Sequence, residues 1–138
     1  MRSPAIQQAD LVILSAGSLL TSLMPNLLLT ELLEAIANSE APVIFIANMQ
    51  PIDDAVGALT LDQQCQWMEQ ILGQNIIDAV IWPRSREHHD CDWIYTLTTD
   101  VGDNNSPLRH DKIKLISAIN SILEKFKSTA LSNTNTAA

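Results

Sequence analysis

The chain has 138 residues, of which 46% are hydrophobic and 17% charged, and its formal net charge is −8 at pH 7. These values predict one globular domain with a hydrophobic core and argue against an intrinsically disordered chain. The acidic charge argues against nucleic acid or an anionic membrane as the main partner, although backbone amides can bind an anion inside an acidic protein.

The sequence also bears on the cellular compartment. Two cysteines, Cys65 and Cys91, are too few for a disulfide framework and favour reduced thiols. The N-terminal residues MRSPAIQQAD lack the apolar core of a signal peptide, and no apolar run approaches the ~20 residues of a membrane span. We therefore expect a cytoplasmic protein.

The first predicted element is a buried strand over residues 10–14. Its apolar run has no polar alternation, which is typical of a strand covered on both faces of a parallel sheet. Small residues and hydroxyls follow at once, and they let a ligand approach the backbone and the unpaired amides of the next helix. We expect a phosphate-bearing ligand here, at Ser15, Gly17, Ser18, Thr21 and Ser22; a turn that binds nothing is the alternative.

A helix is predicted from Pro25 to about Asn38, and a second buried strand over residues 43–47. Asn48 follows this strand, so we expect it to border the same cleft. The next loop carries Asp53 and Asp54, which could hold Mg²⁺ together with a substrate phosphate; solvated loop carboxylates are the alternative.

The second predicted helix is marked by residues at its two ends. Thr60 and Gln63 fit a capping box, and Gly73 suits a C-terminal stop, so a helix is predicted between them. Cys65 falls on its apolar face, which favours a core position over a nucleophile.

A third strand is predicted over residues 78–82, followed by a polar loop over 83–92 and a weaker extended run over 93–98. The loop segment His88–Asp92 has the composition of a metal site, but five adjacent residues cannot all face one ion. An exposed polar loop is the favoured interpretation, and residues 101–107 are predicted to be a further loop.

The last helix is predicted to begin near Ser106 or at Asp111, with an apolar stripe at 115, 116, 119, 122, 123 and 126. Arg109 could hold a phosphate and His110 could exchange a proton; the alternative is that this segment only starts the helix. Residues 1–127 are expected to form one α/β domain, and residues 128–138 a disordered polar tail.

The order of strands and helices predicts the fold class. Strands alternate with helices across short connections, and right-handed crossovers make such strands parallel. We expect a Rossmann-like, partial doubly wound sheet of three to four mostly parallel strands, with helices on both faces.

Four segments carry a family resemblance: ADLVILSAGSLLTSLMPNLLLTELLEAI, APVIFIANM, IIDAVIWP and LRHDKIKLISAINSIL. Together they resemble the carboxyl-terminal part of the YvcK/CofD-like family and its gluconeogenesis factors. The resemblance implies a Rossmann-type fold and phosphate-ligand chemistry. One branch of the family is the 2-phospho-lactate transferase of deazaflavin-cofactor synthesis; the other binds nucleotide sugars such as UDP-N-acetylglucosamine and affects gluconeogenic growth, cell wall and cell shape.

The family's loop motif falls on residues 15–22, where Ser15 replaces a glycine and Ala16 a proline, and its Arg-His-Asp falls on Arg109, His110 and Asp111. The family's amino-terminal motifs have no counterpart in this sequence. We therefore expect the carboxyl-terminal portion of a longer family member, or a shortened relative. Its exposed strand edge and apolar helix faces predict a homodimer or higher oligomer.

Three functions remain open from the sequence. The first is a regulatory domain that binds a UDP-sugar-like ligand and needs no cofactor. The second is part of a transferase of phosphate-containing groups, for which Mg²⁺ would be a cofactor in the complete family protein. The third is a structural fragment that forms oligomers and binds no ligand.

Overall fold

The computed structural model of the chain describes residues 10–14, 30–49, 60–86 and 94–137. Four strands form a parallel sheet in the order β1-β2-β3-β4. They are β1 (Val12–Leu14), β2 (Val43–Ile46), β3 (Ala79–Pro83) and β4 (Tyr95–Thr99). This arrangement confirms the predicted α/β class and the parallel pairing that right-handed crossovers require.

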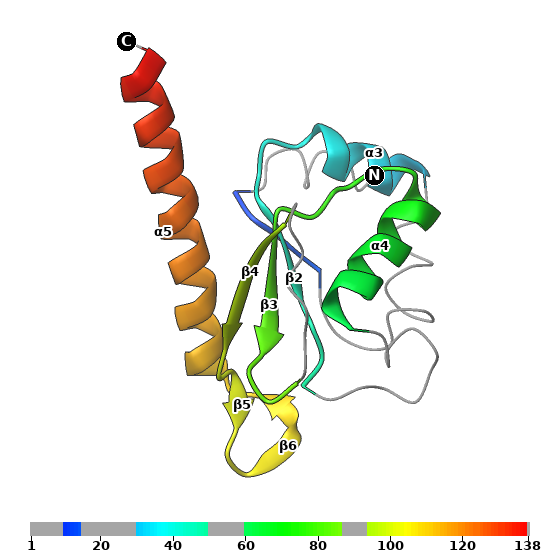
Figure 1. The fold of residues 1–138 in the computed structure, drawn as a ribbon, viewed down its shortest axis with the longest axis vertical. Helices are drawn as coiled ribbons and strands as arrows, with labels where there is room; N and C mark the ends of the chain where they lie inside the picture. The colour runs from blue at the N-terminus through cyan, green and yellow to red at the C-terminus, as the bar shows by residue number, and fades with distance from the viewer. Residues whose placement is uncertain (1–9, 15–29, 50–59, 87–93, 138) are drawn as a thin grey trace.

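Helices cover both faces of the sheet (Figure 1). Helices α3 (Thr30–Asn38) and α4 (Leu61–Leu72) lie on one side, and α5 (Lys112–Ala137) lies on the other. The start and end of α4 are as predicted: Gln63 Oε1 accepts a hydrogen bond from the backbone N–H of Thr60 at 3.1 Å, and Gly73 ends the helix with φ of 76°.

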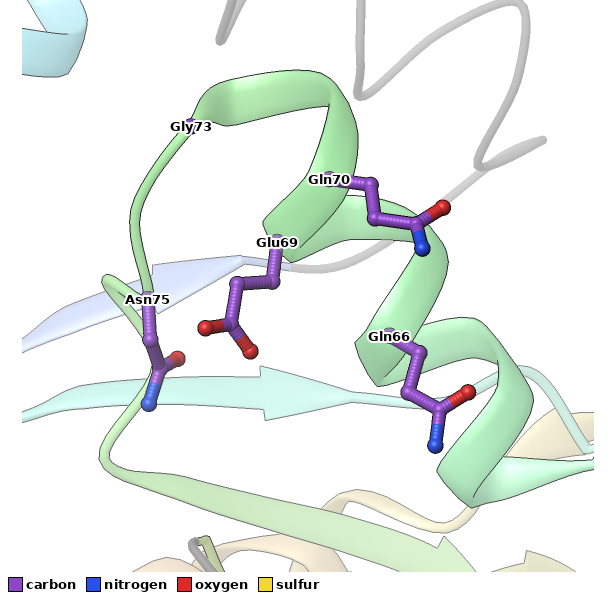
Figure 2. Close-up of a pocket in the computed structure, with 5 residues that line it drawn as sticks. All are labelled: Gln66, Glu69, Gln70, Gly73 and Asn75. Carbon is purple, nitrogen blue, oxygen red and sulfur yellow. The ribbon is translucent and has the colours of Figure 1, made fainter.

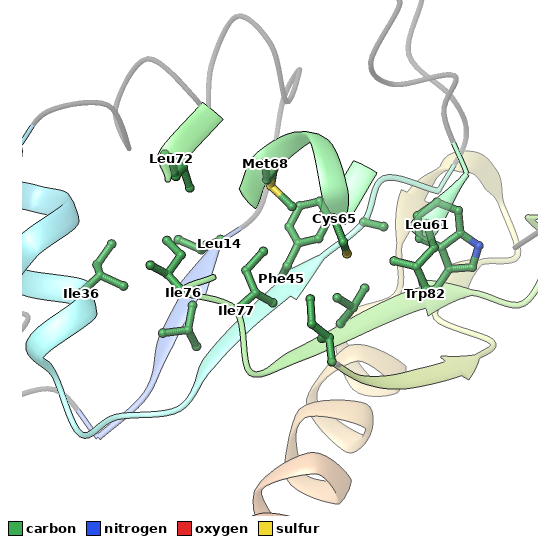
Figure 3. Packing of buried hydrophobic residues seen from close by; sticks show 14 residues of the cluster. Leu14, Ile36, Phe45, Leu61, Cys65, Met68, Leu72, Ile76, Ile77 and Trp82 are labelled. Atoms are coloured by element: carbon green, nitrogen blue, oxygen red, sulfur yellow. The ribbon is translucent and has the colours of Figure 1, made fainter. Parts of the chain in front are cut away.

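Alternation along the strands divides the core into two clusters. In β2, Phe45 points toward α3 and α4, whereas Ile44 and Ile46 point toward α5. Figure 3 shows the first cluster, in which Phe45, Cys65, Met68 and Trp82 pack between the sheet and α4. Cys65 is buried there, which confirms its predicted core position.

The second cluster lies beneath α5, where five of the six predicted stripe residues pack: Leu115, Ile119, Ile122, Leu123 and Phe126. The sixth, Ile116, is 57% exposed, so its predicted place in the core is wrong. The stripe is wider than the contact, because α5 lies along β3 and β4 and Ile116 falls on its flank.

The segment before α5 differs from the prediction of a loop over residues 101–107. It forms an antiparallel hairpin of β5 (Gly102–Asp103) and β6 (Ser106–His110). Strands this short give no periodic signal, although Asn104 and Asn105 at the tip suit a turn.

Helix α5 begins after Asp111, the second of the two predicted starts. Asp111 Oδ2 accepts a hydrogen bond from the backbone N–H of Lys114 at 2.9 Å, as a helix cap does. The helix continues to Ala137, through residues that the sequence assigned to a disordered tail. This segment contains neither proline nor glycine, so no residue in it breaks the helix.

Candidate functional site

The carboxyl ends of the four parallel strands meet at one edge of the sheet, where the β5–β6 hairpin also lies (Figure 1). Ligands of open α/β sheets bind at this edge, because the connections that leave the strand ends can open a crevice there. The described residues at this edge include Asn48 after β2, Arg86 after β3 and Asp100 after β4.

Arg86 is held in a tight turn directly after β3. Its backbone N–H donates to Pro83 O at 3.0 Å, and the indole Nε1 of Trp82 donates to Arg86 O at 3.3 Å. The guanidinium carbon lies 4.2 Å from the centre of the Trp82 ring, a cation–π contact. These contacts fix the direction in which the side chain leaves the turn.

The Arg86 side chain also links two strand ends. Its Nη1 donates to the backbone carbonyl of Asn48 at 3.0 Å, so the ends of β2 and β3 share one half-buried cation. Burial lowers the pKa of the Arg86 guanidinium, but an arginine remains charged at neutral pH. The edge therefore carries a permanent positive charge in a chain whose net charge is −8.

His110 approaches the same strand end from the hairpin. Its Nε2 lies 2.9 Å from Ala47 O, and because a carbonyl only accepts, this ring nitrogen carries the proton. The neighbouring Arg109 is exposed. Successive residues of a strand point to opposite faces, so Arg109 and His110 do not face one ligand from the same side of β6.

A surface ion pair joins α5 to this edge. Lys114 Nζ donates to Asp100 Oδ2 at 2.9 Å and to Gly102 O at 3.0 Å. The hydrogen bond from Lys114 to the Asp100 carboxylate, and after it the one from the Gly102 N–H to Asp100 Oδ1, hold the pKa of Asp100 below its ordinary value. The pair anchors the first turn of α5 beside β4 and β5.

The structure brings together Asn48 and His110, two of the predicted site residues, at the end of β2. A third, Arg109, is exposed on β6 and is not brought to this point. The remaining predicted site residues lie outside the described ranges: Ser15, Gly17, Ser18, Thr21, Ser22, Asp53 and Asp54. Leu14, the last described residue before the predicted loop at 15–22, is at the carboxyl end of β1.

The sequence analysis did not identify Arg86 as a site residue, although it considered His88–Asp92 in the same loop. The segment His88–Asp92 lies outside the described residues. The signal that could have found it is a basic residue three positions after the end of a buried strand. Within the part of the chain that the structure describes, no three His, Cys, Asp or Glu side chains gather as a metal site, and no helix could cross a membrane.

A separate hollow lies on the outer side of α4 (Figure 2). Its described lining residues are Gln66, Glu69, Gln70, Gly73 and Asn75. Gly73 and Asn75 lead into β3, so the hollow is near the amino end of that strand and away from Arg86. Among these described residues the charged one, Glu69, is acidic, which disfavours an anion.

Comparison with known proteins places these features in a family context. A family model described as 2-phospho-L-lactate transferase CofD matches residues 3–126. A protein of Vibrio cholerae named "Putative gluconeogenesis factor" is 42% identical over 116 residues, which are 83% of this chain and 39% of that protein. A protein of the same name from Yersinia pestis is 36% identical over 88% of this chain and 40% of its own length.

Solved structures agree with the sequence relatives. A crystal structure of a Bacillus halodurans protein matches with a TM-score of 0.72 and 25% identity, over 85% of this chain and 45% of that one. A second crystal structure, described as a member of the UPF0052 family from that organism, matches with a TM-score of 0.68 and 24% identity, over 83% of this chain and 44% of that one. The chain thus spans about two fifths of the length of the curated relatives it matches.

Proposed function

The chain belongs to the 2-phospho-L-lactate transferase CofD family, and we propose that it acts there as a nucleotide-sugar-binding regulatory domain of the gluconeogenesis-factor type. The relatives reported above carry the gluconeogenesis-factor name, whereas the transferase name describes the family model. This difference favours binding and regulation over group transfer.

The observation that carries the proposal is the position of Arg86. A guanidinium is matched in shape and charge to phosphate oxygens, which it can bind through two parallel hydrogen bonds. Trp82 and the Asn48 carbonyl orient this group at the carboxyl edge, where α/β sheets bind their ligands. Orientation before binding lowers the entropy cost of holding a phosphate.

The loop that follows β1 would supply the second half of the site. Its small and hydroxyl residues, Gly17 and Ser18 among them, favour approach of an oxyanion to main-chain amides. The loop starts at Leu14, and β1 pairs with β2, whose end Arg86 contacts. A diphosphate lying between this loop and Arg86 is the ligand geometry that we propose.

Titration calorimetry with UDP-N-acetylglucosamine tests the assignment. We expect a saturable heat with the unaltered chain, at least a tenfold weaker affinity for Arg86→Gln, and loss of binding for Gly17→Trp. Arg84→Gln is the matched control, because it removes the same charge from an exposed side chain two residues away. No heat with the unaltered chain, or equal losses for both arginine variants, would contradict the proposal.

A further inference from the structure

Strand β4 forms one edge of the sheet in the part of the chain that the structure describes. It is the last strand in the order β1-β2-β3-β4, and all five of its residues are half-buried. The N–H of Tyr95 donates to Asp78 O at 3.3 Å, so the backbone groups of Tyr95 face β3. Because successive residues of a strand alternate, the N–H and C=O of Thr96 point outward from this edge.

Helix α5 lies beside this edge, on one face of the sheet (Figure 1). Its flank on the β4 side is marked by Lys114, which forms its ion pair directly after β4, and by Lys125, which lies 5.3 Å from the centre of the Tyr95 ring. Ser121 is rotated by only about 20° and 40° around the helix from these two lysines. Ser117 and Ser121 are exposed and precede Lys125 at spacings of four, so the three form one row, which we call the β4-side ridge.

A second copy joined at this edge would bring the two α5 helices to packing distance. Since α5 lies along both β3 and β4, its axis is about half a strand spacing inside β4. Two β4 strands about 4.8 Å apart would therefore place the two helix axes about 9.6 Å apart. Packed helices lie about 8–10 Å apart, so strands and helices would make contact at the same time.

The twist of the sheet gives a second, independent agreement. Adjacent strands are rotated by roughly −20 to −25°, so helices two strand spacings apart cross at about −40 to −50°. This is the commonest crossing angle of packed helices, and it arises when rows of residues four apart interdigitate. The β4-side ridge is such a row, and its two serines are small enough to let the helix axes approach.

One twofold axis can serve both layers. Lys114 is level with the end of β4 and Lys125 with its beginning, so Ser121 is level with the middle of the strand. An axis there lets Thr96 exchange both backbone hydrogen bonds with the partner's Thr96, and it places Ser121 beside the partner's Ser121 and the partner's Lys125. Every lysine of the chain lies on α5, so this contact is less acidic than the rest of a molecule whose net charge is −8.

We propose that this edge binds a second copy of the chain, through antiparallel pairing of the two β4 strands and crossing of the two α5 helices at Ser121. The sheet then continues through both copies. The contact is small, since each copy contributes one five-residue strand and one helix crossing, so we expect a dissociation constant in the micromolar range. The pairing is independent of the ligand proposed above.

Sedimentation velocity at chain concentrations from about 1 to about 200 μM tests the proposal. We expect a reversible monomer–dimer equilibrium for the unaltered chain. Ser121→Lys should weaken the dimer at least tenfold, because it places a long cationic side chain beside the partner's Lys125 at the helix crossing. Asn120→Lys is the matched control: Asn120 is exposed and rotated about 120° around α5 from Lys114, outside the contact, so this variant should dimerise as the unaltered chain does.

Hydrogen exchange and a strand variant test the other layer. The Thr96 amide of the unaltered chain should become protected as the concentration rises through this range, while the amides of α4 do not change. Thr96→Pro should abolish the dimer and keep the fold, because the N–H that it removes points away from β3. A monomer at every concentration, equal weakening by Asn120→Lys, or a dimer in which the Thr96 amide exchanges as in the monomer would each overturn the proposal.

Discussion

Replacing Arg86 with methionine tests whether this side chain joins the ends of β2 and β3. The substitution removes the cation–π contact with Trp82 and the hydrogen bond to the Asn48 carbonyl. A hydrogen bond from a charged donor is worth about 1.5–3 kcal/mol, and a cation–π contact about 0.5–2 kcal/mol. Methionine avoids the cost of half-burying a charge and keeps part of the packing on the ring, which offsets part of this loss. We expect the free energy of unfolding to fall by about 2 kcal/mol.

Urea unfolding followed by far-ultraviolet circular dichroism measures this change. A loss of about 2 kcal/mol would lower the transition midpoint by about 1 M for a domain of this size. Arg84→Met is the control, since Arg84 is exposed and its backbone contact to Thr99 O does not involve the side chain. That variant should stay within about 0.5 kcal/mol of the unaltered chain. An unchanged midpoint for Arg86→Met, or equal losses for the two variants, would refute the assigned contacts.

Three further predictions concern the elements around the site. Gly73→Ala should lower the free energy of unfolding by about 1 kcal/mol, because residue 73 has a φ of 76°, and Gly73→Asn should cost less; chemical denaturation measures both. A Cβ on Gly102 would lie 2.7 Å from Met49 Cε, the movable end of a flexible side chain, so Gly102→Ala should lower the free energy of unfolding by less than about 1 kcal/mol. A double-mutant cycle checks the cause, because Gly102→Ala should cost nothing when Met49→Ala is already present. Lys114→Met should raise the pKa of Asp100 toward its ordinary value. Because the folded-state pKa is the lower one, the pair stabilises the fold above the unfolded-state pKa and loses this effect as pH falls through the folded-state pKa. The difference in melting temperature from the unaltered chain should therefore shrink below about pH 4, and a constant difference would argue against the ion pair.

The sequence predicts the parallel sheet well because its signals are local. Continuous apolar runs mark β2 and β3, and the Thr60–Gln63 box and Gly73 mark both ends of α4. The β5–β6 hairpin is different, because its shorter strand has two residues and its stability comes from contacts with distant elements. The prediction that Ile116 belongs to the buried stripe of α5 is wrong for a related reason. Helical spacing identifies an apolar stripe, but the width of the sheet surface beneath the helix decides how much of that stripe is buried.

In the site, too, the sequence predicts the position of residues next to a strand but not contacts between residues far apart in the chain. Asn48 lies at the carboxyl edge because it is the second residue after the buried strand β2, and its contact with a ligand stays a prediction. Arg86 was not identified, because the carbonyl it contacts is 38 residues earlier in the sequence. The same holds for His110, whose partner carbonyl is 63 residues away, so its docking on β2 could not be predicted from the Arg-His-Asp segment alone.

The most direct test of the central claim, that this edge binds a phosphate ligand through Arg86, is a crystal structure of the chain with UDP-N-acetylglucosamine. We predict that the diphosphate lies within hydrogen-bond distance of the Arg86 guanidinium, between the ends of β1 and β3. Density for the nucleotide sugar elsewhere on the protein, for example in the hollow beside α4, would contradict the account.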